Sequence, residues 1–167
     1  PTLVCGADDT LYLTCREAVD DLWRADMYMK PVDGQWKGPQ PLLQARQPGY
    51  SHFQEALSWG PNHQTLHLSS RIHEQQEDGD AERETLIYLK SIDGGETWIQ
   101  QDDHIVDLPV QSNDLPALLN GGRGESKPSI RSGNITVDSS GTPYIVYSAG
   151  TEMYLTWLRD RMWVQLS

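Results

Sequence analysis

The sequence has few basic residues and no long apolar run. Lys and Arg together number 13 against 24 Asp and Glu, which gives a formal net charge of −11. This balance argues against a protein that neutralises nucleic-acid phosphates, and against a polybasic module that binds membrane surfaces. No apolar stretch approaches the roughly 18 residues that span a bilayer. The 167 residues are enough for one domain with its own core.

Cysteine is scarce as well, since Cys5 and Cys15 are the only two. Two cysteines are too few for a disulfide framework or for a cysteine-based zinc site. A short turn between them would pair Cys5 with a residue near Leu11 and leave Cys15 further along the ladder, so we expect two buried thiols.

The acidic run 74–84 lacks the spacing of a calcium loop. We therefore predict no metal and no other cofactor.

Helical periodicity is also missing, apart from a possible short helix at Leu115–Leu119. Short strand patterns take its place. Three similar runs of β-branched and aromatic residues lie at Thr10–Arg16, Thr65–Arg71 and Thr142–Ser148. Each follows a polar turn and a further strand candidate, which makes three hairpins. The preceding strand candidates are Thr2–Cys5, Phe53–Trp59 and Asn134–Val137.

A second hairpin follows in each unit and ends in a tryptophan. Its expected strands are Met27–Lys30 with Asp33–Trp36, Leu86–Lys90 with Asp93–Trp98, and Met153–Leu158 with Asp160–Trp163. Each unit thus has four short antiparallel strands, a sheet too small to bury both of its faces alone. Radial stacking is how β-propellers bury such sheets.

The sequence therefore predicts an all-β protein, a β-propeller of four-stranded antiparallel blades. We expect one partial propeller domain over 1–167, with blades at about 1–43, 52–106 and 132–167 and a long connecting loop at 107–131. Three blades are half of a six-bladed ring, so a homodimer that closes such a ring is a possible assembly.

The middle unit contains a specific turn motif. Ser91, Asp93, Gly95, Thr97 and Trp98 occupy every fixed position of the pattern S-x-D-x-G-x-T-W. The serine and aspartate can satisfy turn amides, the glycine supplies a positive φ, and the tryptophan can fill the gap between two sheets. The motif resembles the Asp-box, or BNR repeat, of sialidase-like β-propellers, with weaker remnants in the other two units.

This resemblance implies a secreted or periplasmic, carbohydrate-active protein, similar to the sialidase (neuraminidase) type of glycoside hydrolase that acts on acidic glycans. It also implies that the Asp-box lies on the face opposite the substrate site, so Asp93 is expected to be structural. Two alternatives remain open. One is a non-catalytic propeller that binds glycan or protein, and the other is a lyase that cleaves uronic-acid polysaccharides.

Candidate substrate-binding residues lie in the loops that would share the face opposite the Asp-box. Arg16 and Arg71 are expected at equivalent ends of the second strands of adjacent blades. A pair of guanidinium groups can hold the carboxylate of a sialic or uronic acid. The alternative is that each arginine forms a solvated ion pair, with Glu17 or Glu74.

Candidate catalytic residues depend on the reaction. A histidine with a tyrosine near an arginine could abstract a proton next to a carboxylate, as a polysaccharide lyase must. Hydrolysis needs two carboxyl groups, or a tyrosine nucleophile with its carboxylate partner. We predict catalytic roles for Glu17, Asp21, Tyr50 and His52, and substrate binding by Arg16, Arg71, His73, Arg123 and Arg131.

Overall fold

The computed structural model describes residues 1–75, 82–123 and 128–167, and it is all-β, as predicted. In these residues the strands are β1 (Thr2–Cys5), β2 (Leu11–Val19), β3 (Leu22–Lys30), β4 (Lys37–Gln44), β5 (Ser51–Trp59), β6 (Leu66–Gln75), β7 (Glu82–Ser91), β8 (Leu119–Gly121), β9 (Ile130–Val137), β10 (Pro143–Ala149), β11 (Glu152–Arg159) and β12 (Met162–Leu166). A single 3-10 turn, η1 (Pro61–His63), follows β5.

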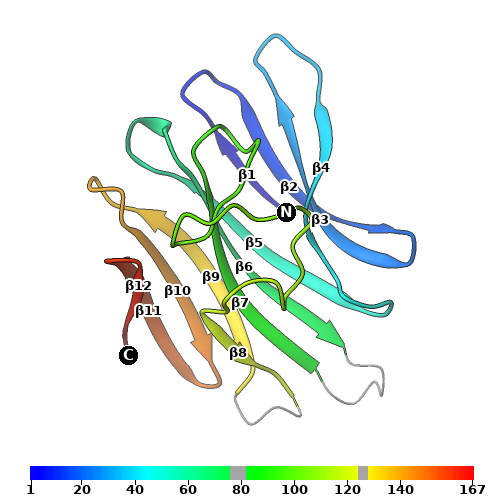
Figure 1. Ribbon diagram of the computed structural model, residues 1–167, viewed down its shortest axis with the longest axis vertical. Coiled ribbons are helices and arrows are strands. Elements are labelled where there is room, and N and C mark those ends of the chain that lie inside the picture. The colour runs from blue at the N-terminus through cyan, green and yellow to red at the C-terminus, as the bar shows by residue number, and fades with distance from the viewer. Residues whose placement is uncertain (76–81, 124–127) are drawn as a thin grey trace.

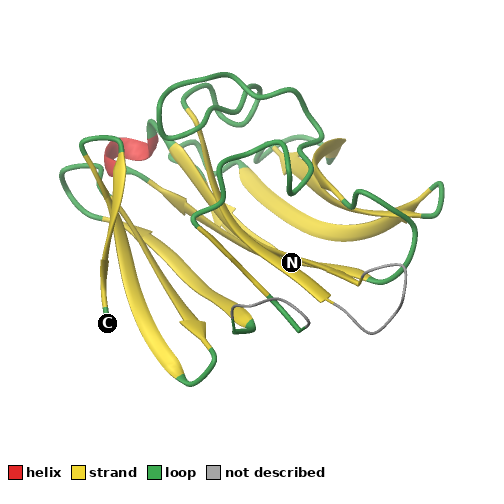
Figure 2. Ribbon diagram, turned by 60° about the horizontal axis from the view of Figure 1, so that its bottom comes forward, coloured by secondary structure: helices red, strands yellow, loops and turns green. Residues whose placement is uncertain are grey.

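The strands form three four-stranded antiparallel sheets in the orders β1-β2-β3-β4, β5-β6-β7-β8 and β9-β10-β11-β12. We call these sheets blades 1, 2 and 3. They lie one beside the next in chain order (Figures 1 and 2), and the first strands of neighbouring blades contact each other. The arrangement is a partial β-propeller of three blades.

Blade 2 is buried on both faces because it lies between the other two. Along β7 the side chains alternate between two hydrophobic cores. Ile87 and Leu89 pack toward blade 1, in a core that also contains Met27 and Trp98. Leu86 and Tyr88 pack in the second core, with the residues of blade 3.

The outer blades each leave one sheet face uncovered. In β2 only Tyr12 and Thr14 are buried and in β11 only Thr156 is, whereas β6 and β7 are buried at most positions. On blade 3 the uncovered face carries Leu155 and Leu166, which are exposed in spite of their apolar side chains. These faces are where further blades would pack in a closed ring.

The fourth strands differ from the sequence prediction. Asp33–Trp36 is not a strand: a turn closed by the Gly34 N–H and the Pro31 carbonyl occupies this segment, and β4 begins only at Lys37. Trp36 is exposed and does not fill an inter-sheet gap. Asp33 and Gly34, which suggested the beginning of a strand, instead form the turn that connects β3 to β4.

The fourth strand of blade 2 is also displaced along the chain. After Ile99 the chain leaves the blade, and Val110 hydrogen-bonds to Leu42 and Gln44 at the edge of blade 1. It then returns as β8, inside the segment 107–131 that was expected to be a connecting loop. The predicted helix at Leu115–Leu119 is absent, because the end of this segment pairs with β7 as part of the sheet.

The cysteines confirm one expectation and overturn another. Cys5 pairs with Leu11 in the β1–β2 hairpin, as the short turn predicts, and both thiols are free. They are not buried, however: Cys5 is exposed and Cys15 is half-buried. Both side chains point to the uncovered face of blade 1. Cys15 and Leu11, the partner of Cys5, lie on the face of β2 opposite to that of the buried Tyr12 and Thr14.

Candidate active site

The predicted histidines and most of the predicted arginines lie within the strand ladders rather than in loops. Arg16 is inside β2, paired with Ala25, and Arg71 is inside β6, paired with Leu86. Neither is at a strand end, because both hairpins continue pairing beyond the apolar pattern, to Val19 and Gln75 respectively. A ladder position holds each side chain in a fixed direction, as a binding site requires.

Two histidines form the centre of the site. His52 of β5 and His73 of β6 are directly opposed partners of an antiparallel pair, so their side chains lie on the same sheet face. The ring of Tyr50, just before β5, meets the ring of His73 edge to face, with 5.8 Å between their centroids. Tyr50 is half exposed, so its phenol is open to solvent and to a ligand.

Arg16 reaches from blade 1 to these groups of blade 2. Its Nη1 donates a hydrogen bond of 3.0 Å to the Ser51 carbonyl oxygen. Its Cζ lies 4.3 Å from the centroid of the Trp23 ring and 5.6 Å from that of Tyr50. Cation–π contact with two aromatic rings holds the guanidinium in place across the boundary between the blades.

Arg71 is a buried cation with unused hydrogen-bond donors. Its side chain is 14% exposed, and the nearest carboxylate oxygen, Oε1 of Glu84, is 3.6 Å from Nη1. In the part of the chain that the structure describes, Nε and Nη1 of Arg71 have no hydrogen-bond partner. Burial is the largest effect on the pKa of Arg71 and lowers it, but a guanidinium stays protonated in proteins. A ligand carboxylate could satisfy these donors.

Glu84 is a buried carboxylate that joins this cluster to blade 3. It contacts His73 Nδ1 at 3.3 Å and accepts hydrogen bonds from the Ser129 hydroxyl and the Ile130 N–H. Burial alone would raise the pKa of Glu84. The hydrogen bonds and the charge of Arg71 outweigh that effect and lower it.

The sequence reading missed Glu84 because it ends the acidic run 74–84, which looks like a solvated loop. The middle of that run lies outside the described residues. One signal was present: Glu84 precedes Leu86 and Tyr88 at alternate positions of a strand pattern, so it shares their buried face.

His52 is electrostatically distinct from its partner. Burial lowers the pKa of His52, and the positive charges of Arg16, Arg71 and His73 lower it further. A histidine with a lowered pKa is neutral near pH 7 and can accept a proton. The positive charges of both arginines thus act on this imidazole.

Other predicted site residues do not join the cluster. Glu17 lies on the opposite face of β2 from Arg16, where it accepts a hydrogen bond from the Tyr28 hydroxyl. Asp21 is exposed at the tip of the β2–β3 turn. Arg123 is exposed and forms an ion pair of 3.2 Å with Glu82.

Arg131 of β9 is exposed and lies at the edge of the cluster. Its positive charge contributes to lowering the pKa of Arg71, so it adds to the positive field on this side of the blades. Arg131 comes from blade 3, Arg71 from blade 2 and Arg16 from blade 1. The cations of blades 2 and 3, Arg71 and Arg131, are therefore close enough to interact.

The motif of the middle unit forms a tight turn at the other end of the blades. Asp93 accepts hydrogen bonds from the Ser91 hydroxyl and from the backbone N–H and hydroxyl of Thr97. Trp98 is fully buried between blades 1 and 2, and its Nε1 donates to the Gly95 carbonyl oxygen. Gly95 has φ 92°, and a Cβ there would come within 2.5 Å of Met27 Cε.

Among residues 1–75, 82–123 and 128–167, no group of three His, Cys, Asp or Glu side chains is placed to hold a metal ion. In the same residues, no helix has the length and apolar character needed to cross a membrane.

Comparison with known proteins gives a likeness of fold. No family model matches the chain, and no curated protein matches it by sequence. A polysaccharide lyase of the PL25 family, an ulvan lyase bound to -[GlcA(1-4)Rha3S]-, superposes with a TM-score of 0.74 at 14% identity, over 98% of this chain and 42% of that one. The same lyase without that ligand gives 0.73 at 14% identity, with the same coverage.

The polysaccharide lyase Uly1 gives a TM-score of 0.73 at 13% identity, over 99% of this chain and 40% of that one. The chain thus spans less than half the length of these lyases. At these identities the likeness concerns architecture, and it agrees with a partial propeller. The solved neighbours are lyases, and the specific resemblance to sialidases gains no support from them.

Proposed function

We propose that this chain belongs to a polysaccharide lyase that cleaves next to a uronic acid, and that Arg71 and Arg16 neutralise the carboxylate of that uronic acid. The observation that carries the proposal is the guanidinium of Arg71 beside two histidines, because its Nε and Nη1 have no hydrogen-bond partner among the described residues. A buried donor without a partner is costly, unless a ligand satisfies it.

Neutralisation of the carboxylate is the first requirement of the reaction. The proton on C5 of a uronic acid becomes more acidic when the adjacent carboxylate carries less negative charge. A guanidinium can hold a carboxylate with two parallel hydrogen bonds, and a low-dielectric site strengthens the pair. Arg71 supplies a pre-positioned fork for this purpose, and Arg16 adds a second positive charge at the rim.

His52 is the group best suited to remove the C5 proton. Its lowered pKa keeps the imidazole neutral at pH 7, so it can accept that proton. It shares a sheet face with His73 and lies near both arginines. The base is thus adjacent to the groups that would hold the carboxylate, as proton abstraction next to that carboxylate demands.

His73 and Tyr50 provide the remaining groups. The contact of Glu84 with Nδ1 of His73 fixes the direction of that imidazole, so Nε2 points away from the carboxylate. The exposed hydroxyl of Tyr50, next to His73, is placed to donate a proton to the leaving sugar oxygen. In the elimination the C5–H and C4–O bonds break, a C4=C5 double bond forms, and the leaving oxygen gains a proton.

Hydrolysis of the sialidase type has less support. That reaction needs a carboxyl group near the nucleophile, but Glu17 lies on the other face of β2 and Asp21 is at an exposed turn. The solved neighbours are polysaccharide lyases, and one is bound to an oligosaccharide that contains glucuronic acid. An acidic glycan is therefore the proposed partner.

The test is product analysis after incubation with a polysaccharide of the repeat GlcA(1-4)Rha3S. A lyase gives fragments that absorb ultraviolet light through the new double bond and weigh one water less than hydrolysis products. The His52→Gln variant should yield none of them, while the exposed His104→Gln variant should match the parent chain. Saturated fragments would contradict the proposal in favour of a hydrolase. Binding without cleavage would contradict it in favour of a binding module.

A further inference from the structure

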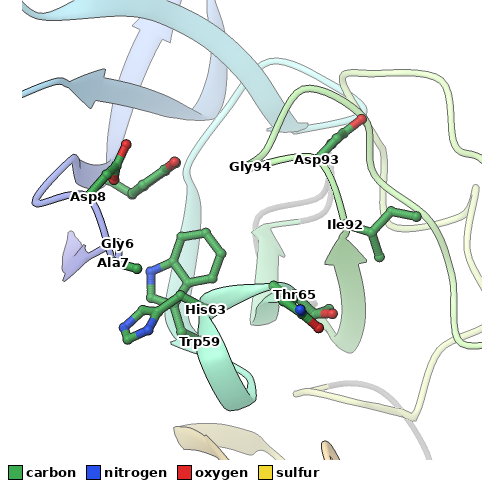
Figure 3. Close-up of a pocket in the computed structure, with 11 residues that line it drawn as sticks. Gly6, Ala7, Asp8, Trp59, His63, Thr65, Ile92, Asp93 and Gly94 are labelled. Carbon is green, nitrogen blue, oxygen red and sulfur yellow. The ribbon is translucent and has the colours of Figure 1, made fainter.

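A concave site lies at the end of blades 1 and 2 opposite the His52–His73 cluster. An open cavity of about 640 Å³ is bordered by three turns: the β1–β2 turn, the β5–β6 turn and the turn that follows β7. Figure 3 shows Trp59 at its centre, with Asp8 on one side and Ile92 on the other. Its volume lies within the range of about 300–1,000 Å³ that is usual for small-ligand sites.

Aromatic rings form one wall of this cavity. The indole of Trp59 is half-buried and meets the Tyr12 ring edge to face, with centroids 5.2 Å apart. The exposed ring of His63 lies 5.7 Å from the same indole, tilted by 50°. Rigid aromatic surfaces of this kind pack against the C–H faces of sugar rings, because those faces are apolar while the ring edges carry hydroxyl groups.

Hydrogen-bonding groups line the remainder. The carboxylate of Asp8, the amide of Gln64 and the hydroxyl of Thr65 all border the cavity. Asp8 accepts two hydrogen bonds from Thr10, which fixes the carboxylate and leaves further lone pairs for a ligand.

The charge of the cavity distinguishes it from the proposed active site. Its lining includes the carboxylates of Asp8 and Asp93 and contains no arginine or lysine. An anionic sugar would be repelled here, whereas sugar hydroxyl groups donate readily to carboxylates. A neutral sugar ring can pack against the aromatic wall and donate hydrogen bonds to the carboxylates.

The two sites are also far apart. Trp59 is seven residues beyond His52 along β5 (59 − 52 = 7), a distance of about 23 Å in an extended strand. A ligand in the cavity does not contact Arg71 or His73. We propose that this cavity binds a neutral sugar residue, independently of the cationic cluster, as a separate non-catalytic carbohydrate site.

The test is an NMR titration that follows the indole Nε1–H resonances of the six tryptophans. The probes are cellohexaose, xylohexaose and maltohexaose, with oligogalacturonate as the anionic comparison. We expect at least one neutral hexasaccharide to shift the Trp59 resonance, and oligogalacturonate to leave it in place. A Trp59 resonance that no neutral probe moves, or that oligogalacturonate moves equally, would overturn the proposal.

Two conservative variants separate binding from folding. His63 and Asp8 are both exposed, so His63→Ala and Asp8→Asn should fold as the parent does. Each variant should bind the neutral sugar about fivefold more weakly, which is the effect expected for one lost contact. His104→Ala, at another exposed histidine, should leave the affinity unchanged. Equal affinity in all three variants would contradict the assignment. The outcome does not depend on the lyase proposal.

Discussion

His52 and His73 are directly opposed across the β5–β6 pair, yet Glu84 contacts the imidazole of His73 and not that of His52. Two identical side chains on one sheet face therefore have different electrostatic environments. His73 is oriented by a buried carboxylate, while His52 is surrounded by positive charge, which lowers its pKa. This difference is the basis for assigning the proton-accepting role to His52 and a positioning role to the His73–Glu84 pair.

The pKa of His52 should respond to its cationic neighbours. In the parent chain we expect an NMR titration midpoint below the usual value of about 6.5 for histidine. Replacing Arg16 by Gln removes one positive charge and should raise that midpoint. A proton-accepting base acts only when neutral, so activity should fall as the pH drops through this pKa, and the acid limb of the profile should move to higher pH in Arg16→Gln. An unchanged midpoint would show that Arg16 does not act on His52.

His67 should make stability depend on pH. Burial lowers the pKa of His67 from 6.5 to about 4, and its Nδ1 is 2.7 Å from the Tyr88 hydroxyl. In the unfolded chain His67 takes up a proton near pH 6.5, whereas in the folded chain it does so only near pH 4. The free energy of unfolding is therefore highest above pH 6.5 and falls as the pH drops toward 4. The shift corresponds to a loss of about 3 kcal/mol in the free energy of unfolding.

Urea denaturation at several pH values measures this effect. The His67→Gln variant should lose the part of the pH dependence that lies between 6.5 and 4. His104 is exposed, so His104→Gln should keep it. A parent chain and a His67→Gln variant with the same slope in that window would contradict the account.

The turn at Ser91–Trp98 should contribute stability and not uronate binding. Asp93→Ala removes the acceptor for the Thr97 N–H and hydroxyl, and should lower the free energy of unfolding by about 1 kcal/mol. Glu96→Ala, an exposed change in the same turn, serves as the control and should have little effect. Loss of uronate binding in a folded Asp93→Ala protein would contradict this separation of the turn from the cationic cluster.

The uncovered faces of blades 1 and 3 bear on assembly. If two copies close a six-bladed ring, light scattering should give a mass near twice 18.9 kDa. A mass near 18.9 kDa would contradict this homodimer. In that case Leu155 and Leu166 would stay exposed in the isolated chain.

Local pattern predicted the first hairpin of each unit, because alternating residues and a polar turn lie within about 15 residues of each other. It gave the β1 bounds and the pairing of Cys5 with Leu11. It failed for β8, because the chain from Ile99 onward packs against blade 1 before it returns to β7. A short window of sequence contains no signal for such non-local pairing.

The candidate site was predictable in its residue types rather than in its geometry. Arginine, histidine and tyrosine in one region indicated a site for an acidic glycan. The separation of Arg16 from Glu17 depends on the face to which each side chain points, and that face is set by the strand register. The role of Glu84 could not be predicted because it depends on burial. The residues that bury Glu84 come from blade 3, which is distant in the sequence.

The most direct test of the central claim is calorimetric titration with an oligosaccharide of GlcA(1-4)Rha3S. The account predicts that Arg71→Gln weakens binding by about tenfold, as expected for the loss of a charged hydrogen-bonded pair. Arg159→Gln, an exposed arginine of blade 3, should bind as the parent does. An oligosaccharide with glucose in place of glucuronic acid should also bind about tenfold more weakly to the parent. If Arg71→Gln binds the acidic oligosaccharide as tightly as the parent, the claim that Arg71 holds the carboxylate is wrong.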